Sequence, residues 1–437
     1  MLINFSIENW MSFRDRTDFT MTATKEQQHG DRLAKLKKYR LRALPTAVIY
    51  GGNASGKTNF FKAINFAKHY ITKGSLPDYP INVEPFLLNE GKRKSPVSFT
   101  FEILIENDLY ELSFTLSTME VIEEKLIKKT GSSEKTLYHR MKNGIPIVLH
   151  PSVATGRLMF AFDGTRDNQL FLTNSVSQKI TTFLPVFKWF SETLVLIAPD
   201  TRFDSFEQFI TESNSLYDTM NSVLPNLDTG ISHLGGEEIS MDSLPFHKEF
   251  NQKLKEEVKN NHAIKIRNKD EQIIVTRQDD ELSVHKLYTY HRDSKRKDIR
   301  FEMRQESDGT RRIIDLLPAI LDLVNTRIPK VYIIDEIDRS LHYLLIRQLL
   351  EIFLSSCSEI SRKQLLFTTH DLLLMDQALF RRDEMWITER DPEGSSRMIS
   401  FSEYEDIRND KDILKSYLQG RMGGIPNIVA KPVWNAE

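Results

Sequence analysis

The sequence has little of several features that mark specialised proteins. Its 437 residues include a single cysteine, Cys357, which excludes a disulfide framework and a cysteine-rich zinc or iron–sulfur site. No apolar run approaches the ~20 residues needed to cross a bilayer. The opening residues, MLINFSIENW, lack the basic and apolar regions of a secretory signal. The sequence therefore predicts a soluble, cytoplasmic protein that makes no contact with a membrane.

Excess charge of either sign is also absent. The 59 Lys and Arg residues nearly balance the 61 Asp and Glu residues, which leaves a formal net charge of −2. This balance excludes a histone-like polycation, so any contact with nucleic acid would need a local basic patch. Residues 32–42 and 291–300 form two basic runs, but the first contains a single aromatic residue, Tyr39, and the second has no Phe, Trp or Tyr, and each is also typical of a solvated loop. Contact with nucleic acid therefore stays open.

The composition and the hydrophobic pattern together predict an α/β fold. With 40% hydrophobic and 27% charged residues, the chain has an ordinary globular composition. Strands that alternate with helices indicate a parallel core sheet covered on both faces, and alternating apolar and polar residues near the N-terminus indicate antiparallel hairpins. We expect antiparallel strands within 3–23 and 97–116, buried strands at 47–50, 330–334, 364–368 and 385–388, and helices at 58–72, 309–325 and 343–353.

The middle of the chain has a different pattern. Amphipathic helical stretches, for example at 246–262, are mixed with short strands such as 272–276. We interpret residues 174–298 as an α/β, mainly helical insertion. It would separate an N-terminal half of the main domain, residues 1–173, from a C-terminal half, residues 299–437.

A glycine-rich motif follows the predicted strand at 47–50. The segment fits G-x-x-x-x-G-K-[ST], whose backbone N–H groups wrap a phosphate at the start of a helix. Lys57 would reach the β- and γ-phosphates, and the Thr58 hydroxyl would bind Mg²⁺. The predicted strand before the motif and helix after it match the arrangement that confirms a nucleotide site. The residues that would bind the nucleotide are Gly51, Gly52, Asn53, Ala54, Ser55, Gly56, Lys57, Thr58 and Asn59.

Two carboxylates follow the predicted strand at 330–334. Asp335 could support Mg²⁺, and Glu336 would then be free to polarise a water for attack on the γ-phosphate. A solvated acidic loop is the alternative explanation for this pair. His370 follows the predicted strand at 364–368 and could contact the γ-phosphate or hold the attacking water, although a lone histidine is more often structural. Groups at the carboxyl ends of parallel strands lie where open α/β sheets bind ligands.

These segments resemble a known family. GGNASGKTN, YIIDEIDRSLH and LLFTTHD are similar to the phosphate loop, acidic strand and switch-histidine strand of ABC-type ATPase heads, as found in transporters, SMC proteins and OLD-family nucleases. The opening NF and NWMSF resemble the N-terminal hairpin of SMC-like heads. ESDGTRR at 306–312 and the tail segments MWITER, YLQGR and GIP resemble the abortive-infection class of AAA ATPases. The resemblance covers about residues 1–115 and 300–428.

The resemblance implies an ATP- and Mg²⁺-dependent ATPase that works as a homodimer or higher homo-oligomer. Ser307, Asp308 and Gly309 would be a signature motif that contacts the nucleotide held by another subunit, whereas the residues alone are equally explained as a helix cap. Residues 338–342 would be the loop that crosses the dimer interface.

Two features depart from the family pattern. The first glutamine after Thr58 is Gln169, too far along the chain for the usual Q-loop glutamine. Pro318 falls inside the predicted signature helix and should kink it.

Three functions are compatible with these motifs. The first is a nucleotide-gated sensor or scaffold in anti-phage abortive infection, which controls a separate effector, a nuclease encoded by a neighbouring gene. The second is a DNA-maintenance ATPase that grips or tethers DNA, although long heptad arms are lacking. The third is a small-molecule P-loop kinase, which leaves the signature and switch-histidine segments unexplained. No carboxylate set for a nuclease centre follows His370, so we expect none in this chain.

Overall fold

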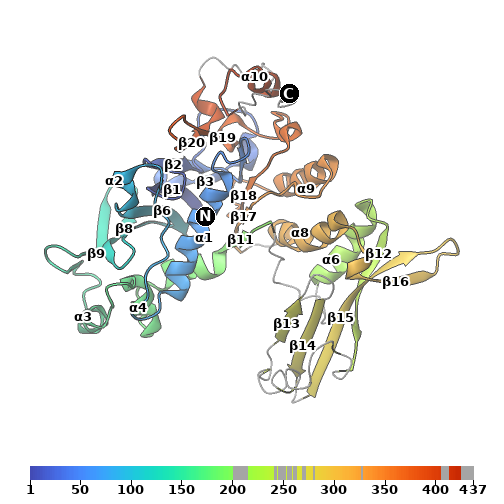
Figure 1. Cartoon of the computed structure of the whole chain (residues 1–437), viewed down its shortest axis with the longest axis horizontal. Helices are drawn as coiled ribbons and strands as arrows, with labels where there is room; N and C mark the ends of the chain where they lie inside the picture. Colours follow the sequence, from blue (N-terminus) through green and yellow to red (C-terminus); the bar gives the residue numbers. More distant parts are fainter. Residues whose placement is uncertain are drawn as a thin grey trace, which may run out of the picture. The chain divides into compact units, whose positions relative to one another are not determined.

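The computed structural model describes residues 1–199, 215–240, 244, 252, 258, 263–267, 272–278, 281–325, 328–404 and 413–424. The chain divides into two compact units (Figure 1). The first unit is made of Met1–Pro199, Thr326–Asp338 and Leu350–Glu437, and the second of Asp200–Asn325 and Arg339–Leu349.

A seven-stranded antiparallel sheet forms one layer of the first unit. Its strand order is β10-β9-β8-β7-β6-β1-β2. Apolar residues alternate with polar ones along the strands: in β1, for example, Phe5 packs in the core and lies between the polar residues Asn4 and Ser6. The antiparallel strands expected within 3–23 and 97–116 are confirmed. The strands are β1 (Leu2–Glu8), β2 (Thr17–Thr20), β6 (Val97–Ile105), β7 (Asp108–Leu116), β8 (Val121–Lys129), β9 (Glu134–Met141) and β10 (Ile147–Leu149).

A six-stranded sheet forms the second layer, with the order β11-β17-β18-β5-β19-β20. All its neighbours are parallel except β19 and β20, and the four buried strands predicted from the sequence are confirmed. Because β5, β17 and β18 run in parallel, their carboxyl ends meet at one edge of the sheet. The strands are β5 (Thr46–Tyr50), β11 (Leu194–Ile197), β17 (Val331–Ile334), β18 (Gln364–Thr368), β19 (Met385–Arg390) and β20 (Ser396–Ser400).

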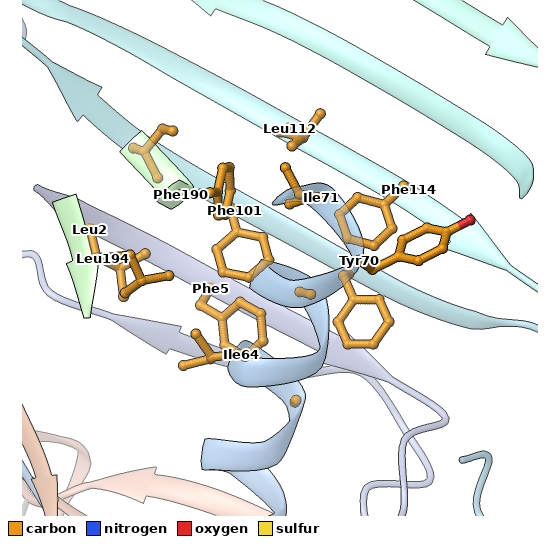
Figure 2. Close-up of a cluster of buried hydrophobic side chains, with 14 of the residues drawn as sticks. Leu2, Phe5, Ile64, Tyr70, Ile71, Phe101, Leu112, Phe114, Phe190 and Leu194 are labelled. Atoms are coloured by element: carbon orange, nitrogen blue, oxygen red, sulfur yellow. The ribbon is translucent and has the colours of Figure 1, made fainter. Parts of the chain in front are cut away.

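Helix α1 (Lys57–Lys73) packs in the hydrophobic core that both sheets share. Phe60, Ile64 and Ile71 of α1 belong to the same buried cluster as Phe5 and Phe101 of the antiparallel sheet and Leu194 of the parallel one, and Figure 2 shows Ile64 and Ile71 beside Phe5 and Phe101. The rings of Phe5 and Phe60 meet edge to face, 5.5 Å apart. Each such aromatic side chain contributes roughly 1.5–3 kcal/mol by leaving water, so this core fixes the start of α1 against β5.

Short turns cover the other face of the parallel sheet. The Tyr50 hydroxyl donates to the Leu374 carbonyl at 2.8 Å, and the Phe367 ring lies 6.2 Å from that of Phe380. Both faces of the sheet are therefore covered, as the sequence predicts. The turns are η8 (Leu372–Leu374), η9 (Arg382–Glu384) and η10 (Phe401–Glu403).

Short elements complete the first unit. One of them, α4 (Phe171–Ser177), begins at the buried carboxylate of Glu124, which accepts the N–H groups of Phe171 at 2.7 Å and Leu172 at 3.0 Å. Burial raises the pKa of Glu124 above its ordinary value. The others are η1 (Gly30–Arg32), β3 (Ala34–Leu36), η2 (Lys37–Tyr39), β4 (Leu41–Ala43), α2 (Glu90–Arg93), α3 (Gly156–Asp163), α5 (Leu184–Lys188), the π-helical turn η3 (Trp189–Thr193) and α10 (Ile413–Leu418).

The second unit contains an antiparallel sheet with helices. Its strand order is β12-β15-β14-β13, with β16 paired to β15, and Figure 1 shows β13, β14 and β15 side by side. Val275 and Val284 pack in its small hydrophobic cluster. The elements are α6 (Ser215–Val223), η5 (Leu224–Asn226), β12 (Ile231–Glu238), β13 (Ala263–Arg267), β14 (Gln272–Gln278), β15 (Glu281–Arg292), β16 (Asp298–Glu302), η7 (Met303–Gln305) and α8 (Asp308–Asn325). Helix α9 (Tyr343–Ser355) begins in this unit and ends in the first.

One expectation needs adjustment here, and another stays a prediction. The described part of residues 174–298 contains more strand than helix, because its period-two segments pair into a sheet. The helix expected at 246–262 lies outside the described residues, apart from Gln252 and Val258. Helix α8 is helical on both sides of Pro318, and the kink at this residue stays a prediction.

Candidate functional site

The phosphate loop connects β5 to α1 in the conformation that its glycines allow. Gly51 and Gly56 have φ angles of 151° and 122°, in the region that side chains rarely adopt. A Cβ at Gly51 would lie 2.5 Å from the Thr388 carbonyl oxygen, and one at Gly56 would lie 2.6 Å from the Ser396 hydroxyl oxygen. Backbone strain and close approach therefore both require glycine at these two positions.

Residues far along the chain hold this loop in place. The hydroxyls of Ser55 and Thr388 lie 2.6 Å apart, and the Ser396 hydroxyl donates to the Ser55 carbonyl at 2.6 Å. On the α1 side, the Asn59 amide donates to the Ser12 hydroxyl at 2.8 Å. The loop is therefore clamped between β19, β20 and the turn after β1.

Lys57 lies at the centre of the loop, and its side chain is buried. Its ammonium group donates to the carbonyls of Gly51 at 2.7 Å and Gly52 at 3.0 Å, and lies 3.5 Å from His370 Nδ1. Burial lowers the pKa of Lys57 to about 8, although the nearby Asp335, Asp338 and Glu336 carboxylates oppose the shift. Lys57 therefore remains mostly charged at neutral pH and can meet an anion.

Asp335 follows β17 and is completely buried. Its Oδ1 accepts the Thr368 hydroxyl at 2.6 Å, while Oδ2 has no hydrogen-bond partner among the described residues. A buried, unpartnered carboxylate oxygen is costly unless a cation or donor reaches it, so this atom fits a metal site. The described residues contain no cluster of three or more His, Cys, Asp or Glu side chains that could hold a metal by themselves. Mg²⁺ suits such a place because it binds through one or two carboxylates together with substrate phosphates.

Glu336 and His370 lie at the same edge and are partly exposed. The backbone of Glu336 has a φ of 49°, and its N–H donates to the Thr368 hydroxyl at 2.8 Å. Glu336 Oε1 lies 4.0 Å from His370 Nε2, and the His370 N–H donates to Asp338 Oδ2 at 3.1 Å. The arrangement places a carboxylate and an imidazole beside the Lys57 ammonium group, with access to solvent.

The predicted signature residues belong to the second unit. The Ser307 hydroxyl accepts the Thr310 N–H at 3.1 Å and thereby caps α8, which agrees with the helix-cap interpretation. A Cβ on Gly309 would lie 2.7 Å from the Ser340 carbonyl, so the two segments are in close contact. A cavity of about 470 Å³ opens here, lined by residues that include Ser307, Gly309, Ser340 and His342.

The structure thus gathers part of the predicted set. Lys57, Asp335, Glu336 and His370 meet at one edge of the parallel sheet. The sequence pattern missed Thr368, which bridges Asp335 and Glu336, although it lies inside the LLFTTHD segment. Thr388 and Ser396 were also missed, because no local signal links residues more than 300 positions from the loop they contact.

Residues 47–376 match the family model described as an AAA domain, putative AbiEii toxin, Type IV TA system. The chain belongs to this family. The match confirms the resemblance to the abortive-infection class of AAA domains that the motifs indicated.

Solved structures similar to this AAA-family chain include SMC heads. One is described as the SMC head domain from Thermotoga maritima, with 12% identity, a TM-score of 0.37, and coverage of 91% of this chain and 98% of that one. Another is described as SmcHead bound to the C-winged helix domain of ScpA, with 10% identity, a TM-score of 0.37, and coverage of 91% and 97%. No curated protein matches the sequence. Among the described residues of the AAA-family chain, no helix combines the length and apolarity needed to span a bilayer.

Proposed function

We propose that this chain binds ATP with Mg²⁺ at the phosphate loop and hydrolyses it to ADP and phosphate. The observation that carries the proposal is the buried Asp335, whose Oδ2 has no partner among the described residues and which lies at the sheet edge with Lys57, Glu336 and His370. A structural carboxylate would be expected to have both oxygens satisfied. The family match independently supports nucleotide chemistry.

Each residue has a distinct role in this proposal. The backbone of residues 51–59 wraps the phosphates and Lys57 binds the β- and γ-phosphates. Thr58 and Asp335 would hold Mg²⁺, which would supply positive charge next to the transferred phosphoryl group. Glu336 takes a proton from the attacking water, and His370 contacts the γ-phosphate. The hydrogen bond from the His370 backbone N–H to Asp338 Oδ2 holds the histidine backbone at the site.

We further propose that two copies of the chain act on each other's nucleotide. Ser307, Asp308 and Gly309 at the start of α8 would bind the γ-phosphate held by a second copy, through free N–H groups and a hydroxyl. ATP would thus drive formation of a homodimer or a higher homo-oligomer. In the cell, this cytoplasmic assembly would be the nucleotide-gated sensor or scaffold of an anti-phage system, with a nuclease from a neighbouring gene as its effector.

Steady-state ATP hydrolysis, with molecular mass followed in ATP, tests the proposal. Glu336→Gln should keep ATP binding, lose at least about 100-fold in turnover and trap a heavier assembly, because the general base is removed while the residues that bind the nucleotide remain. Glu393→Gln, an exposed change in the β19–β20 turn, is the matched control and should behave as wild type. Equal turnover in Glu336→Gln and wild type would show that Glu336 is not the base.

The family description names a toxin, which suggests another division of roles: the chain itself would be the toxic component. Expression in cells that lack the neighbouring genes separates the two assignments. Growth arrest by wild type but not by Lys57→Ala would favour the toxin role. Growth without arrest, with arrest restored by the neighbouring gene, would favour the sensor role.

A DNA-maintenance role is the second candidate, favoured by a basic cavity of about 450 Å³ lined in part by Lys37, Lys38 and Arg362. Ion pairs neutralise some of this charge, since Lys38 Nζ lies 2.7 Å from Asp108 Oδ1. Stimulation of ATP hydrolysis by DNA that disappears in Lys37→Glu would favour this role. Hydrolysis that is indifferent to DNA would favour the defence role.

A further inference from the structure

The residue before the signature segment is tied to the sheet of the second unit. Glu306 is buried and directly precedes Ser307. Its Oε1 accepts the Thr289 hydroxyl at 2.5 Å and lies 2.7 Å from His291 Nε2. Because a carboxylate only accepts hydrogen bonds, His291 Nε2 must carry the proton in this contact.

Both partners of Glu306 come from β15. Thr289 and His291 are two residues apart, so they project from the same face of this strand. Strand β15 pairs with β12, β14 and β16, which makes it the most connected strand of the second unit among the described residues. The imidazole of His291 is held further by the Phe301 ring, 4.5 Å away. The donors are therefore fixed by the sheet and not by a mobile loop.

The contacts of Glu306 also determine where α8 begins. The Glu306 N–H donates to the Met303 carbonyl at 3.3 Å, and the next residue, Ser307, caps the helix through Thr310. On the opposite side, Gly309 lies against the Ser340 carbonyl. A shift of the Glu306 carboxylate would therefore move the first N–H groups of α8, which are the groups that could bind a phosphate.

We propose that Thr289 and His291 are positioning residues for the signature segment: through Glu306, the sheet of the second unit sets the placement of Ser307 and Gly309 and thereby the hydrolysis of a nucleotide held by a second copy. This inference rests on the proposed function, in which the signature segment acts on the partner's nucleotide. It assigns the second unit a regulatory task, because anything that displaces β15 changes the ATPase.

The double variant Thr289→Val and His291→Phe tests the inference in the full-length chain. It removes both donors but keeps the β-branched shape and the ring packed on Phe301. We expect unchanged ATP binding to the first unit, and at least about a tenfold loss of both ATP-driven assembly and turnover, since hydrogen bonds to charged groups are the strong ones. Amide hydrogen exchange at residues 310–313 should become faster even without nucleotide.

Two further variants separate positioning from general loss of structure. His233→Phe is the matched control: His233 lies on β12 of the same sheet, its ring stacks on that of Tyr290 with the centroids 4.4 Å apart, and its described contacts are with Ser232 and Tyr290 and not with Glu306. It should assemble and hydrolyse ATP as wild type does. Thr289→Ser keeps the hydroxyl and should retain nearly full activity, whereas Thr289→Val alone should lose about threefold. This single variant keeps the question testable if the double variant does not fold.

Wild-type assembly, turnover and helix-start exchange in the folded double variant would overturn the inference. Equal losses in His233→Phe would overturn it as well, because the sheet as a whole and not the Glu306 contact would then matter. If wild type itself neither assembles nor hydrolyses ATP, the proposed function falls. The exchange measurement still reports whether Thr289 and His291 position the start of α8.

Discussion

The hydroxyl of Thr368 donates to Oδ1 of Asp335 across a distance of 2.6 Å. The same hydroxyl accepts the N–H of Glu336 at 2.8 Å. One side chain at the end of β18 therefore orients the carboxylate proposed to hold Mg²⁺ and the backbone of the proposed general base. The relationship depends on the parallel pairing of β17 and β18, which brings the two strand ends to the same level.

Replacing Thr368 should therefore reduce catalysis more than nucleotide binding. Thr368→Val leaves both oxygens of the buried Asp335 without a donor among the described residues, which costs about 1–3 kcal/mol. We expect a 10- to 100-fold loss of turnover and a higher Mg²⁺ requirement, with nearly unchanged ATP affinity. Thr368→Ser keeps the hydroxyl and is the control. A Mg²⁺ titration of ATP hydrolysis checks this, and equal curves for the Val and Ser variants would contradict it.

Nucleotide affinity should decrease as the pH rises above about 8. Burial lowers the pKa of Lys57 to about 8, so its ammonium group loses its proton, and with it the attraction to phosphate, at higher pH. ATP binding measured calorimetrically between pH 6.5 and 9.5 should be strongest at the acidic end. Lys57→Arg keeps its charge over this range, so its affinity should be lower but independent of pH. A wild-type affinity that does not change with pH would refute the role of the ammonium charge.

The sequence predicts the strand ends of the site well, because their signals are local. A buried β-branched strand followed by GGNASGKT, or by Asp335 and Glu336, is recognisable within about ten residues, and parallel pairing brings the groups together. The contacts that clamp the loop are not local: Thr388 and Ser396 lie more than 300 residues from Ser55 in the chain. Short polar side chains in strands carry no pattern that identifies such a distant partner.

In the second unit, by contrast, sequence patterns do not predict the dominant secondary structure. Its period-two segment at 281–292 pairs with three neighbouring strands, while the sequence analysis favours a mainly helical insertion over 174–298 as a whole. The deciding interactions are cross-strand pairs between residues far apart in sequence. The bond from His291 to Glu306 is another example, since no sequence pattern links these two residues.

A buried carboxylate should make stability depend on pH in the first unit. Burial raises the pKa of Glu384 to about 7, although the ion pair with Arg32 opposes the shift. The folded chain therefore holds a proton that the unfolded chain releases above about pH 4.5, so this group's contribution to stability decreases as the pH rises from 4.5 to 7. Glu384→Gln removes that titration, so relative to wild type its free energy of unfolding should rise over this interval, by up to about 3 kcal/mol.

Urea unfolding at several pH values measures this difference. Glu359→Gln, which removes an exposed carboxylate in the same unit, should follow wild type in parallel. A constant difference between Glu384→Gln and wild type from pH 4.5 to 7 would mean that Glu384 is ionised throughout the interval, held so by Arg32.

Adding a methyl group at Gly56 should abolish nucleotide binding by two separable effects. The φ of 122° strains any side chain there, and the new Cβ would lie 2.6 Å from the Ser396 hydroxyl oxygen, which itself holds the Ser55 carbonyl.

Gly144→Ala is the matched control, because Gly144 also has a positive φ, 108°, but nothing lies within 4 Å of the position of a Cβ. It should lose about 1–2 kcal/mol of stability from strain alone and keep its ATP affinity. Combining Gly56→Ala with Ser396→Gly removes the contact with Ser396, together with its hydrogen bond to the Ser55 carbonyl, but leaves the strain and a 3.2 Å approach to the Ser12 hydroxyl oxygen, so binding should recover only in part. Gly56→Ala with wild-type ATP affinity would show that the loop reshapes freely and that the clamp from β20 does not set its conformation.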